Sequence, residues 1–402
     1  MKKLIALLLA LVMVLSMTAC TEEGPKSTDP TSPSGETSPT GDPAEKEPLY
    51  QRDSYTGEAL DVRAARDTAV ATMGDAKLTN GLLQIYYWMD VYSFISNYSS
   101  YLSSYGLDIN KPLDEQKANV GSWQHYFLSG ALEGWHHYQA LVLAAEEAGI
   151  KIAPEHQEEL DKLYDDLKKK AEDGKYESVD AMIQSDAGPG CTAEDYYRYN
   201  ELYYTGYSYF NEMLRRIEVT DDMIEKYFTE NEASLGVNGI NKKSGDSCMV
   251  RHILIEVGEE KTDADWETCR QTAQKLLDDW LAGDATEDSF SELAKEHSAD
   301  PGSKEEGGMY KGLTSQTSFV QEFKDWYLEE GRKVGDYGLV KTSYGYHLMY
   351  FSGTEPIWVY YCREAVTDEE ASKIITNAVE KYEMVVNYDD ILLGEVKLTT
   401  TE

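Results

Sequence analysis

The sequence predicts an α+β protein with a mainly helical body, built from both flanks of the chain, and a second domain in which helices surround a small sheet. Its 402 residues, 41% of them hydrophobic, are enough for two or three domains. Residues 79–217 repeat apolar side chains at helical spacing. Two short apolar strands, at 249–257 and 345–351, enclose helical patterns and a turn-rich loop.

The first twenty residues have the features of an export signal. Met1-Lys2-Lys3 is basic, and the apolar run from Leu4 to Leu15 is too short to span a membrane comfortably. The small residues before Cys20 resemble a lipoprotein cleavage box, which predicts a signal peptide over 1–19 and a lipidated N-terminus at Cys20. Two acyl chains there would anchor the protein to the outer, extracytoplasmic face of the cell membrane. The alternative is an ordinary signal peptide with an incidental cysteine.

Residues 20–48 form a tether of different composition. Six of the eleven prolines lie here, among Ser, Thr, Gly, Asp and Glu. Such a segment buries too little apolar surface to fold. We therefore predict a disordered spacer between membrane and folded body.

The segment 49–235 is predicted to be a helical body. A short strand at 69–75 precedes helical patterns at 79–104, 113–148, 154–172, 176–186 and 192–217. Residues 82–102 could be a core helix or could present aromatic side chains to unfolded clients. A transmembrane reading is disfavoured because Gln84, Asp90 and Asn97 would enter lipid.

Charge and cysteine content exclude several function classes. The net charge of -36, from 73 acidic and 37 basic residues, argues against nucleic-acid binding and against electrostatic docking on anionic lipid. Beyond Cys20, the remaining cysteines form neither a CxxC motif nor a dense framework, so the sequence leaves their disulfide state open. They are Cys191, Cys248, Cys269 and Cys362.

The second domain, residues 248–352, places one histidine in each of its outer strands. We predict helices at 263–282, 286–297 and 319–329, and a further strand at 337–341. If the first and last strands pair, His252 and His347 become neighbours. A zinc site made by this pair and Asp300 has no third-ligand spacing motif. No metal or other cofactor is therefore predicted.

Three motifs in this stretch resemble the parvulin family of peptidyl-prolyl isomerases. They are the strand around Arg251-His252-Ile253-Leu254, the loop around Asp300 to Gly308, and Thr342 to Tyr350. The resemblance implies a small antiparallel sheet surrounded by helices, and isomerase activity. It further implies a catalytic set, consisting of His252, Asp300, His347 and Thr342. The residues expected to line the pocket for the proline ring are Leu254, Met309, Phe319, Phe323 and Tyr344.

Two departures from the parvulin pattern bear on substrate choice. The family usually has Gly-Gly-x-Leu-Gly where this chain has Gly307-Gly308-Met309-Tyr310, so we expect a different pocket floor. The loop at 256–260 is acidic, whereas the phosphate-reading members carry basic residues there. Since acidic side chains repel a phosphate, we expect no dependence on phosphorylation.

The flanks of this domain complete the prediction. Residues 236–247 are predicted to be a hinge, 358–361 a strand, 367–382 a helix and 383–386 a last strand. We expect the segment 353–402 to pack on the helical body. The strand at 69–75 and the helical patterns that follow it resemble the chaperone segment of exported parvulin foldases of the PrsA and SurA type.

These observations lead to two functional hypotheses. The first is a lipid-anchored isomerase and folding factor for exported proteins, whose partners are unfolded or nascent chains containing X-Pro bonds. The alternative is a holdase chaperone whose parvulin-like domain binds without turnover. A homodimer is compatible with the sequence, which does not identify clients or the preferred residue before proline.

Overall fold

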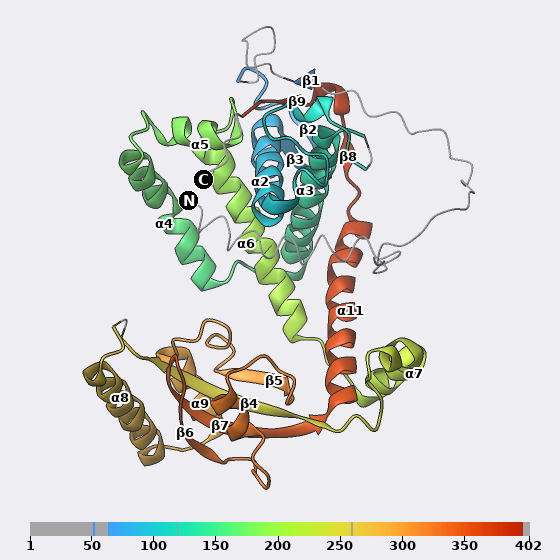
Figure 1. The fold of residues 1–402 in the computed structure, drawn as a ribbon. Helices are drawn as coiled ribbons and strands as arrows, with labels where there is room; N and C mark the ends of the chain where they lie inside the picture. The colour runs from blue at the N-terminus through green and yellow to red at the C-terminus, as the bar shows by residue number, and fades with distance from the viewer. Residues whose placement is uncertain (1–50, 53–62, 120, 259, 397–402) are drawn as a thin grey trace. The chain divides into compact units, whose positions relative to one another are not determined.

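The computed structural model describes residues 51–52, 63–119, 121–258 and 260–396 (Figure 1). The predicted signal peptide, the tether and Cys20 lie outside the described residues. The α+β class is confirmed, because long helices accompany small, mainly antiparallel sheets. The described residues divide into two compact units, the first comprising those up to 217 and from 370 onward, the second comprising those between 218 and 369.

The first unit combines N-terminal helices with the C-terminal end of the chain. Its N-terminal elements are β1 (Gln51–Arg52), β2 (Ala69–Met73), β3 (Ala76–Thr79), α2 (Asn80–Tyr98), α3 (Trp123–Ala148), α4 (Pro154–Asp173), α5 (Val179–Ala187) and α6 (Ala193–Arg215). Short 3-10 turns lie at Ser99–Tyr101 (η2), Leu113–Glu115 (η3) and Tyr388–Asp390 (η4). From the C-terminal flank, β8 (Val385–Val386) pairs with β2, and β9 (Leu392–Leu393) pairs with β1. The two flanks thus share both small sheets.

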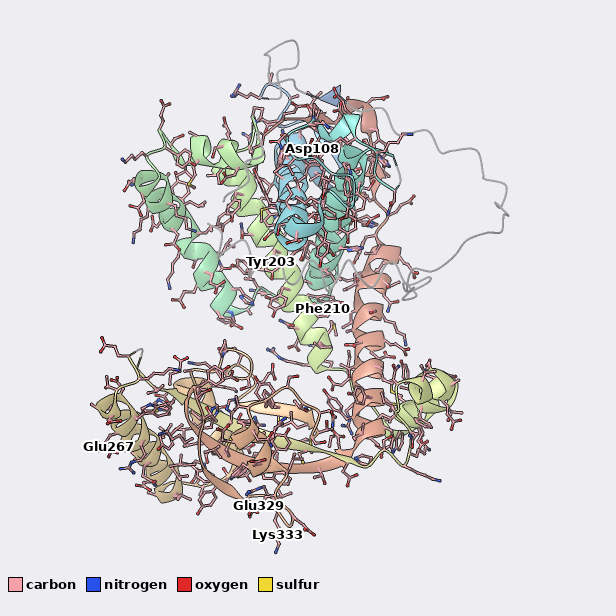
Figure 2. All side chains as sticks on the ribbon, in the orientation of Figure 1. Asp108, Tyr203, Phe210, Glu267, Glu329 and Lys333 are labelled. Carbon is pink, nitrogen blue, oxygen red and sulfur yellow. The ribbon has the colours of Figure 1, made fainter. Side chains whose placement is uncertain are left out.

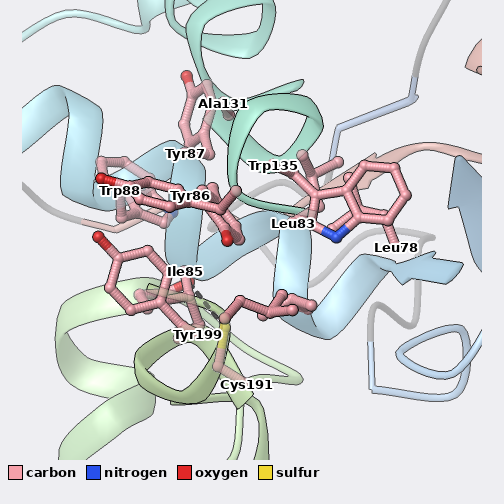
Figure 3. Packing of buried hydrophobic residues seen from close by; sticks show 14 of the residues in the cluster. Leu78, Leu83, Ile85, Tyr86, Tyr87, Trp88, Ala131, Trp135, Cys191 and Tyr199 are labelled. Carbon is pink, nitrogen blue, oxygen red and sulfur yellow. Dashed lines mark hydrogen bonds between the residues drawn. The ribbon is translucent and has the colours of Figure 1, made fainter. Parts of the chain in front are cut away.

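Helix α2 forms the centre of this unit's core. Its first turns are buried all round, from Asn80 through Trp88, as predicted for a core helix. In Figure 3 the aromatic side chains of α2 pack between α3, which carries Ala131 and Trp135, and α6, which carries Tyr199. The rings of Tyr86 and Tyr199 meet edge to face at 4.8 Å. Within the described residues, none of the helices has the length and apolarity that crossing a membrane requires.

Two buried amides on α2 hold the C-terminal segment in place. Asn80 donates to the carbonyl of Asp390 at 2.9 Å and accepts from the backbone N–H of Leu392 at 2.9 Å. One turn later, Gln84 accepts from the N–H of Gly394 at 2.8 Å. Because a buried backbone group left without a partner is costly, these bonds specify where the segment lies.

The second unit is a four-stranded antiparallel sheet with helices on both faces. Its elements are α7 (Asp221–Val237), β4 (Asp246–Glu256), α8 (Asp263–Ala282), α9 (Glu287–His297), β5 (Met309–Leu313), α10 (Gln321–Tyr327), β6 (Tyr337–Lys341), β7 (Gly345–Pro356) and the first part of α11 (Ile357–Lys381). The strand order is β5-β4-β7-β6. Alternate residues of β4 and β7 bury Ile253 and Leu348 against α8 and α9, and Val250 and Met349 on the face of α10.

The helices of this unit begin at strong local signals. Thr262 and Thr286 each form a capping box at the start of α8 and α9, satisfying backbone N–H groups that have no partner inside the helix. The outer side of α8 is charged. Glu267, labelled in Figure 2, pairs with Arg270 there and lies away from the sheet. Amphipathic helices of this kind turn one face to the sheet and the other to water.

Three predictions about the flanks are wrong. Residues 358–361 are not a strand but the first turn of α11, in which Trp358 packs edge to face on Phe228 of α7. This packing overrides the β propensity of the aromatic run. Residues 353–369 were expected to pack on the helical body, but they belong to the second unit together with α7. The predicted hinge at 236–247 lies inside the second unit, so it does not connect the two units.

Candidate active site

Pairing of β4 with β7 brings the two histidines together on one face of the sheet. The register sets Leu254 opposite His347 and His252 opposite Met349, so the two imidazoles are diagonal neighbours. Their Nδ1 atoms lie 3.0 Å apart, and both side chains are buried. The expected proximity of His252 and His347 is therefore observed.

Asp300 lies in the turn after α9 and receives three donors on a single oxygen. Its Oδ2 is 3.0 Å from Nε2 of His252, 2.5 Å from the hydroxyl of Ser303 and 3.0 Å from the hydroxyl of Tyr310. The bond from His252 lowers the pKa of Asp300 well below its usual range, although burial opposes the shift. This carboxyl is therefore ionised at neutral pH.

These partners assign a direction to the whole chain of hydrogen bonds. An ionised carboxylate only accepts, so Nε2 of His252 carries a proton and, in the neutral ring, its Nδ1 accepts from Nδ1 of His347. Nε2 of His347 then accepts from the Thr342 hydroxyl at 2.9 Å, which itself accepts from the N–H of Tyr344 at 3.2 Å. Burial, assisted by the neighbouring His252, lowers the pKa of His347 to about 3. A neutral His347 fits this arrangement.

Aromatic rings enclose the space next to the histidines. Phe323 of α10 stands edge-on to His252 at 5.1 Å and to His347 at 5.3 Å. Phe319 lies 4.9 Å from Phe323 and 4.9 Å from Tyr310, and Tyr310 stacks on His252 at 5.4 Å. The result is an apolar wall of three rings beside a polar network. A ring-shaped apolar ligand and an adjacent polar group would be recognised together here.

Comparison with known families assigns this unit. Residues 237–353 match the family described as a PPIC-type PPIASE domain, in which PPIase denotes a peptidyl-prolyl isomerase. The chain contains a parvulin-type PPIase domain.

Curated relatives match about a quarter to a third of this chain. Chaperone SurA of Pseudoalteromonas atlantica is 36% identical over 116 residues, which are 28% of this chain and 24% of the relative. Foldase protein PrsA of Caldanaerobacter subterraneus is 29% identical over 143 residues, 35% of this chain and 37% of the relative. A probable parvulin-type peptidyl-prolyl cis-trans isomerase of Bordetella pertussis is 34% identical over 110 residues, 27% and 36% of the two chains. The matches thus span less than two-fifths of the relatives' length.

Solved structures of similar proteins were also found. PrsA from Bacillus subtilis has a TM-score of 0.33 at 19% identity, covering 66% of this chain and 89% of that one. The Campylobacter jejuni structure of SurA-like chaperones, described under PEB4 and Cj1289, has a TM-score of 0.20 at 17% identity, covering 78% of this chain and 96% of that one.

The structure corrects one member of the expected pocket of the PPIase domain. Met309 pairs with Arg251, so its side chain lies on the face opposite to His252. The next residue, Tyr310, pairs with Val250 and reaches the pocket instead. Side chains of a strand alternate between faces, so placing the strand one residue out exchanges the two positions.

The other expected pocket residues differ in position. Phe319 and Phe323 lie in the aromatic wall just described, and Leu254 shares the face of His347 and is buried. Tyr344 is 58% exposed, and among the described residues its ring makes none of the aromatic contacts at the histidine network. Its backbone N–H, rather than its ring, contributes to the network through Thr342.

Two residues of the network were missed by sequence reasoning. Ser303 follows Asp300 by three positions, so the turn signal Asp300-Pro301-Gly302 could have predicted that its hydroxyl returns to the carboxylate. Tyr310 was expected to alter the pocket floor, but its hydrogen bond to Asp300 was not predicted. Its role depends on the register of β5, which the sequence does not specify.

Arg251 and a glycine pair hold the loop that presents Asp300. The Arg251 guanidinium pairs with Glu287 of α9 at 3.0 Å and donates to the carbonyls of Glu306 and Gly307, both at 2.9 Å. Gly308 has a φ of +75°, and a Cβ there would lie 2.2 Å from the carbonyl oxygen of His252. The close approach of the loop to β4 therefore requires glycine at this position.

Proposed function

We propose that this protein is a peptidyl-prolyl cis–trans isomerase that assists the folding of exported proteins. The single observation that carries the proposal is the continuous hydrogen-bonded chain Thr342–His347–His252–Asp300 beside a wall of aromatic rings. It lies in a PPIC-type PPIase domain, and relatives named as foldases and chaperones support the folding role.

The chemistry of this site suits rotation about an X-Pro bond. The barrier of about 18–20 kcal/mol arises from amide resonance, and no covalent bond has to break. Phe323 and Phe319 would hold the proline ring, leaving the preceding carbonyl free to twist. An enzyme accelerates this step by binding the twisted amide more tightly than either planar form.

The polar network would act by shaping the pocket rather than by transferring protons. His347 stays neutral at physiological pH because burial lowers its pKa to about 3. His252 and His347 then fix each other's tautomers and hold the Asp300 carboxylate at the edge of the pocket. The carboxylate's field would favour the twisted amide, whose carbonyl has lost conjugation with nitrogen.

The decisive test is isomerisation of short X-Pro peptides by the purified protein, with the residue before proline varied. We expect acceleration over buffer that is lost in His252→Ala and Asp300→Ala. Glu267→Ala, on the outer side of α8, is the matched control and should retain full activity. A folded protein that leaves the peptide rate unchanged would exclude the enzyme.

Lipid anchoring outside the cytoplasm is a separate part of the proposal, supported by the sequence of residues 1–20. Transfer of a diacylglyceryl group to the Cys20 thiol and cleavage before this residue would attach the protein to the membrane through two acyl chains. Mass spectrometry of the mature N-terminus should detect the diacylglyceryl cysteine. In Cys20→Ser, membrane association should be lost; retention of the membrane-bound form would contradict the anchor.

A holdase without turnover is the second candidate, and an exposed aromatic surface on the first unit favours it. Tyr101, Tyr105 and Tyr126 are 61%, 49% and 47% exposed, and the rings of Tyr105 and Tyr126 meet the half-buried Phe94 edge to face. Residues 91–107 carry no charge in a chain of net charge -36. Tyrosine offers broad contact area at low entropic cost, which suits binding to varied unfolded chains.

The first unit also contains a cavity of about 250 Å³, whose lining residues are far in sequence from His252 and His347. Trp88, Leu113 and Pro112 are among its lining residues.

Suppression of client aggregation separates the two candidates. If Asp300→Ala loses peptide isomerisation yet keeps full support of secretion, the result favours the holdase function. If Tyr101→Ser/Tyr105→Ser leaves aggregation suppression unchanged, the aromatic surface is not its binding site.

A further inference from the structure

Tyr310 occupies a position in the pocket where the parvulin pattern has leucine. It lies on β5, and its ring packs with the cluster that covers the α10 face of the sheet. The ring stacks on His252 with an interplanar angle of 29° and meets Phe319 edge to face at 64°. One face of this tyrosine therefore touches the polar network while its edge belongs to the aromatic wall.

The hydroxyl of Tyr310 reaches the atom that His252 also binds. It donates to Oδ2 of Asp300 at 3.0 Å, and burial, assisted by the Asp300 carboxylate, raises the pKa of Tyr310 to about 12. Ser303 donates to the same oxygen. Oδ1 of Asp300 accepts none of these three bonds.

The backbone opposite Tyr310 is shaped to admit this hydroxyl. A Cβ built on Gly302 would lie 2.5 Å from the Tyr310 oxygen, whereas the next ring atom, Cζ, would be 3.7 Å away. The first separation is far below a normal contact and the second is ordinary van der Waals contact. Gly302 and the Tyr310 hydroxyl thus fit one another.

We propose that Tyr310 is a positioning and specificity-determining residue of the PPIase site, whose hydroxyl holds Asp300 on His252 and whose ring forms the third wall of the proline pocket. This inference rests on the proposed isomerase function. The hydroxyl orients a carboxylate that would otherwise be held only by His252 and Ser303. The ring adds to the aromatic surface against which proline packs.

Two substitutions at Tyr310 separate these roles. Tyr310→Phe keeps the ring and removes the hydroxyl, so kcat should fall about tenfold while KM changes less than about twofold, as for loss of one hydrogen bond to a charged group. Tyr310→Leu also removes the ring, so KM for X-Pro peptides should rise in addition. Tyr337→Phe, on the opposite face of the sheet against Trp280, is the control and should leave both constants unchanged.

A double-mutant cycle with Gly302 tests the fit. Gly302→Ala should lower kcat in the native background, because the added methyl displaces the hydroxyl. In the Tyr310→Phe background it should cost little more, since only ordinary contacts remain. Thermal unfolding of each variant shows whether it is folded. Additive effects of the two substitutions, or an unchanged kcat in Tyr310→Phe, would overturn the inference.

The outcome is distinguishable from failure of the proposed function. If the native protein does not accelerate X-Pro isomerisation, the proposed function fails regardless of Tyr310. Positioning is then read from the ¹⁵N imidazole signals of His252, whose Nε2–H donates to the Asp300 oxygen that Tyr310 holds. Tyr310→Phe should shift these signals and Tyr337→Phe should not. Unchanged signals would reject the positioning role independently of activity.

Discussion

The Nδ1 atoms of His252 and His347 face each other at 3.0 Å, so a single proton lies between two buried rings. The rest of the network decides which ring holds it. Asp300 accepts from Nε2 of His252 and thereby fixes the tautomer of this ring. The Thr342 hydroxyl donates to Nε2 of His347, which suits the tautomer that carries its proton on Nδ1. Because burial disfavours a charged His347, acid should destabilise the domain that contains this pair.

Stability of the PPIase domain should therefore fall as pH drops below the usual histidine range. The pKa of His347 is about 3 in the folded protein, against about 6.5 in an unfolded chain. Between these values the unfolded state binds more protons, so this contribution is complete above about pH 6.5 and is lost progressively toward pH 3. The pKa of Asp300 is also lowered, so the stability that this carboxylate contributes is lost only below about pH 4.

Urea unfolding of the whole protein, followed by amide signals of β4 and β7, checks this dependence. The midpoint should decline between pH 6.5 and 4.5. His347→Gln cannot titrate, so its midpoint should change less over the same interval. Equal slopes in the two proteins would show that other groups cause the decline.

Gly308→Ala should strongly destabilise the PPIase domain. The substitution combines a left-handed φ of +75° with a Cβ only 2.2 Å from the His252 carbonyl oxygen. We expect a loss of roughly 2–4 kcal/mol in the free energy of unfolding. Gly331→Ala is the control: its φ is +85°, but no atom lies within 4 Å of the added methyl, so about 1 kcal/mol is expected. Similar losses at both positions would refute the steric argument.

Asn80→Ala should release the C-terminal segment of the first unit. The substitution leaves the N–H of Leu392 and the carbonyl of Asp390 without their buried partner, at a cost of about 1–3 kcal/mol. Hydrogen exchange of residues 388–396 should accelerate. Gln157→Ala, which removes an exposed contact to Asp161, serves as the comparison and should leave exchange of this segment unchanged. Retained protection in Asn80→Ala would show that β9 and β8 hold the segment without Asn80.

Phe323→Leu should weaken substrate binding more than it weakens folding. Phe323 is 3% exposed and contacts both histidines, so leucine keeps part of its buried area but loses the edge-on ring contacts. We expect KM for X-Pro peptides to rise about fivefold to tenfold, from the loss of aromatic contacts beyond area burial. Peptide titrations at a fixed enzyme concentration measure this. Phe290→Leu, buried on the α9 face, should lower stability without changing KM.

Local patterns predicted much of this protein. The helices predicted at 192–217 and 263–282 correspond closely to α6 and α8, because the spacing of apolar residues that predicts a helix lies within a few turns of chain. Apolar strands indicated that His252 and His347 are neighbours, and the resemblance to parvulins implied that Asp300 belongs to the same site. Those motifs carry their meaning in short windows of sequence, which is why they could be interpreted without coordinates.

Tertiary structure decided the features that depend on distant partners. The register of β5 on β4 turned Tyr310, rather than Met309, toward the pocket. Packing of Trp358 on Phe228 made a helix of an aromatic run that favours a strand, and buried amides of α2 drew the end of the chain into the first unit. In each case the free energy that decides between the alternatives comes from contacts between residues far apart in sequence. Local propensity is too weak to oppose it.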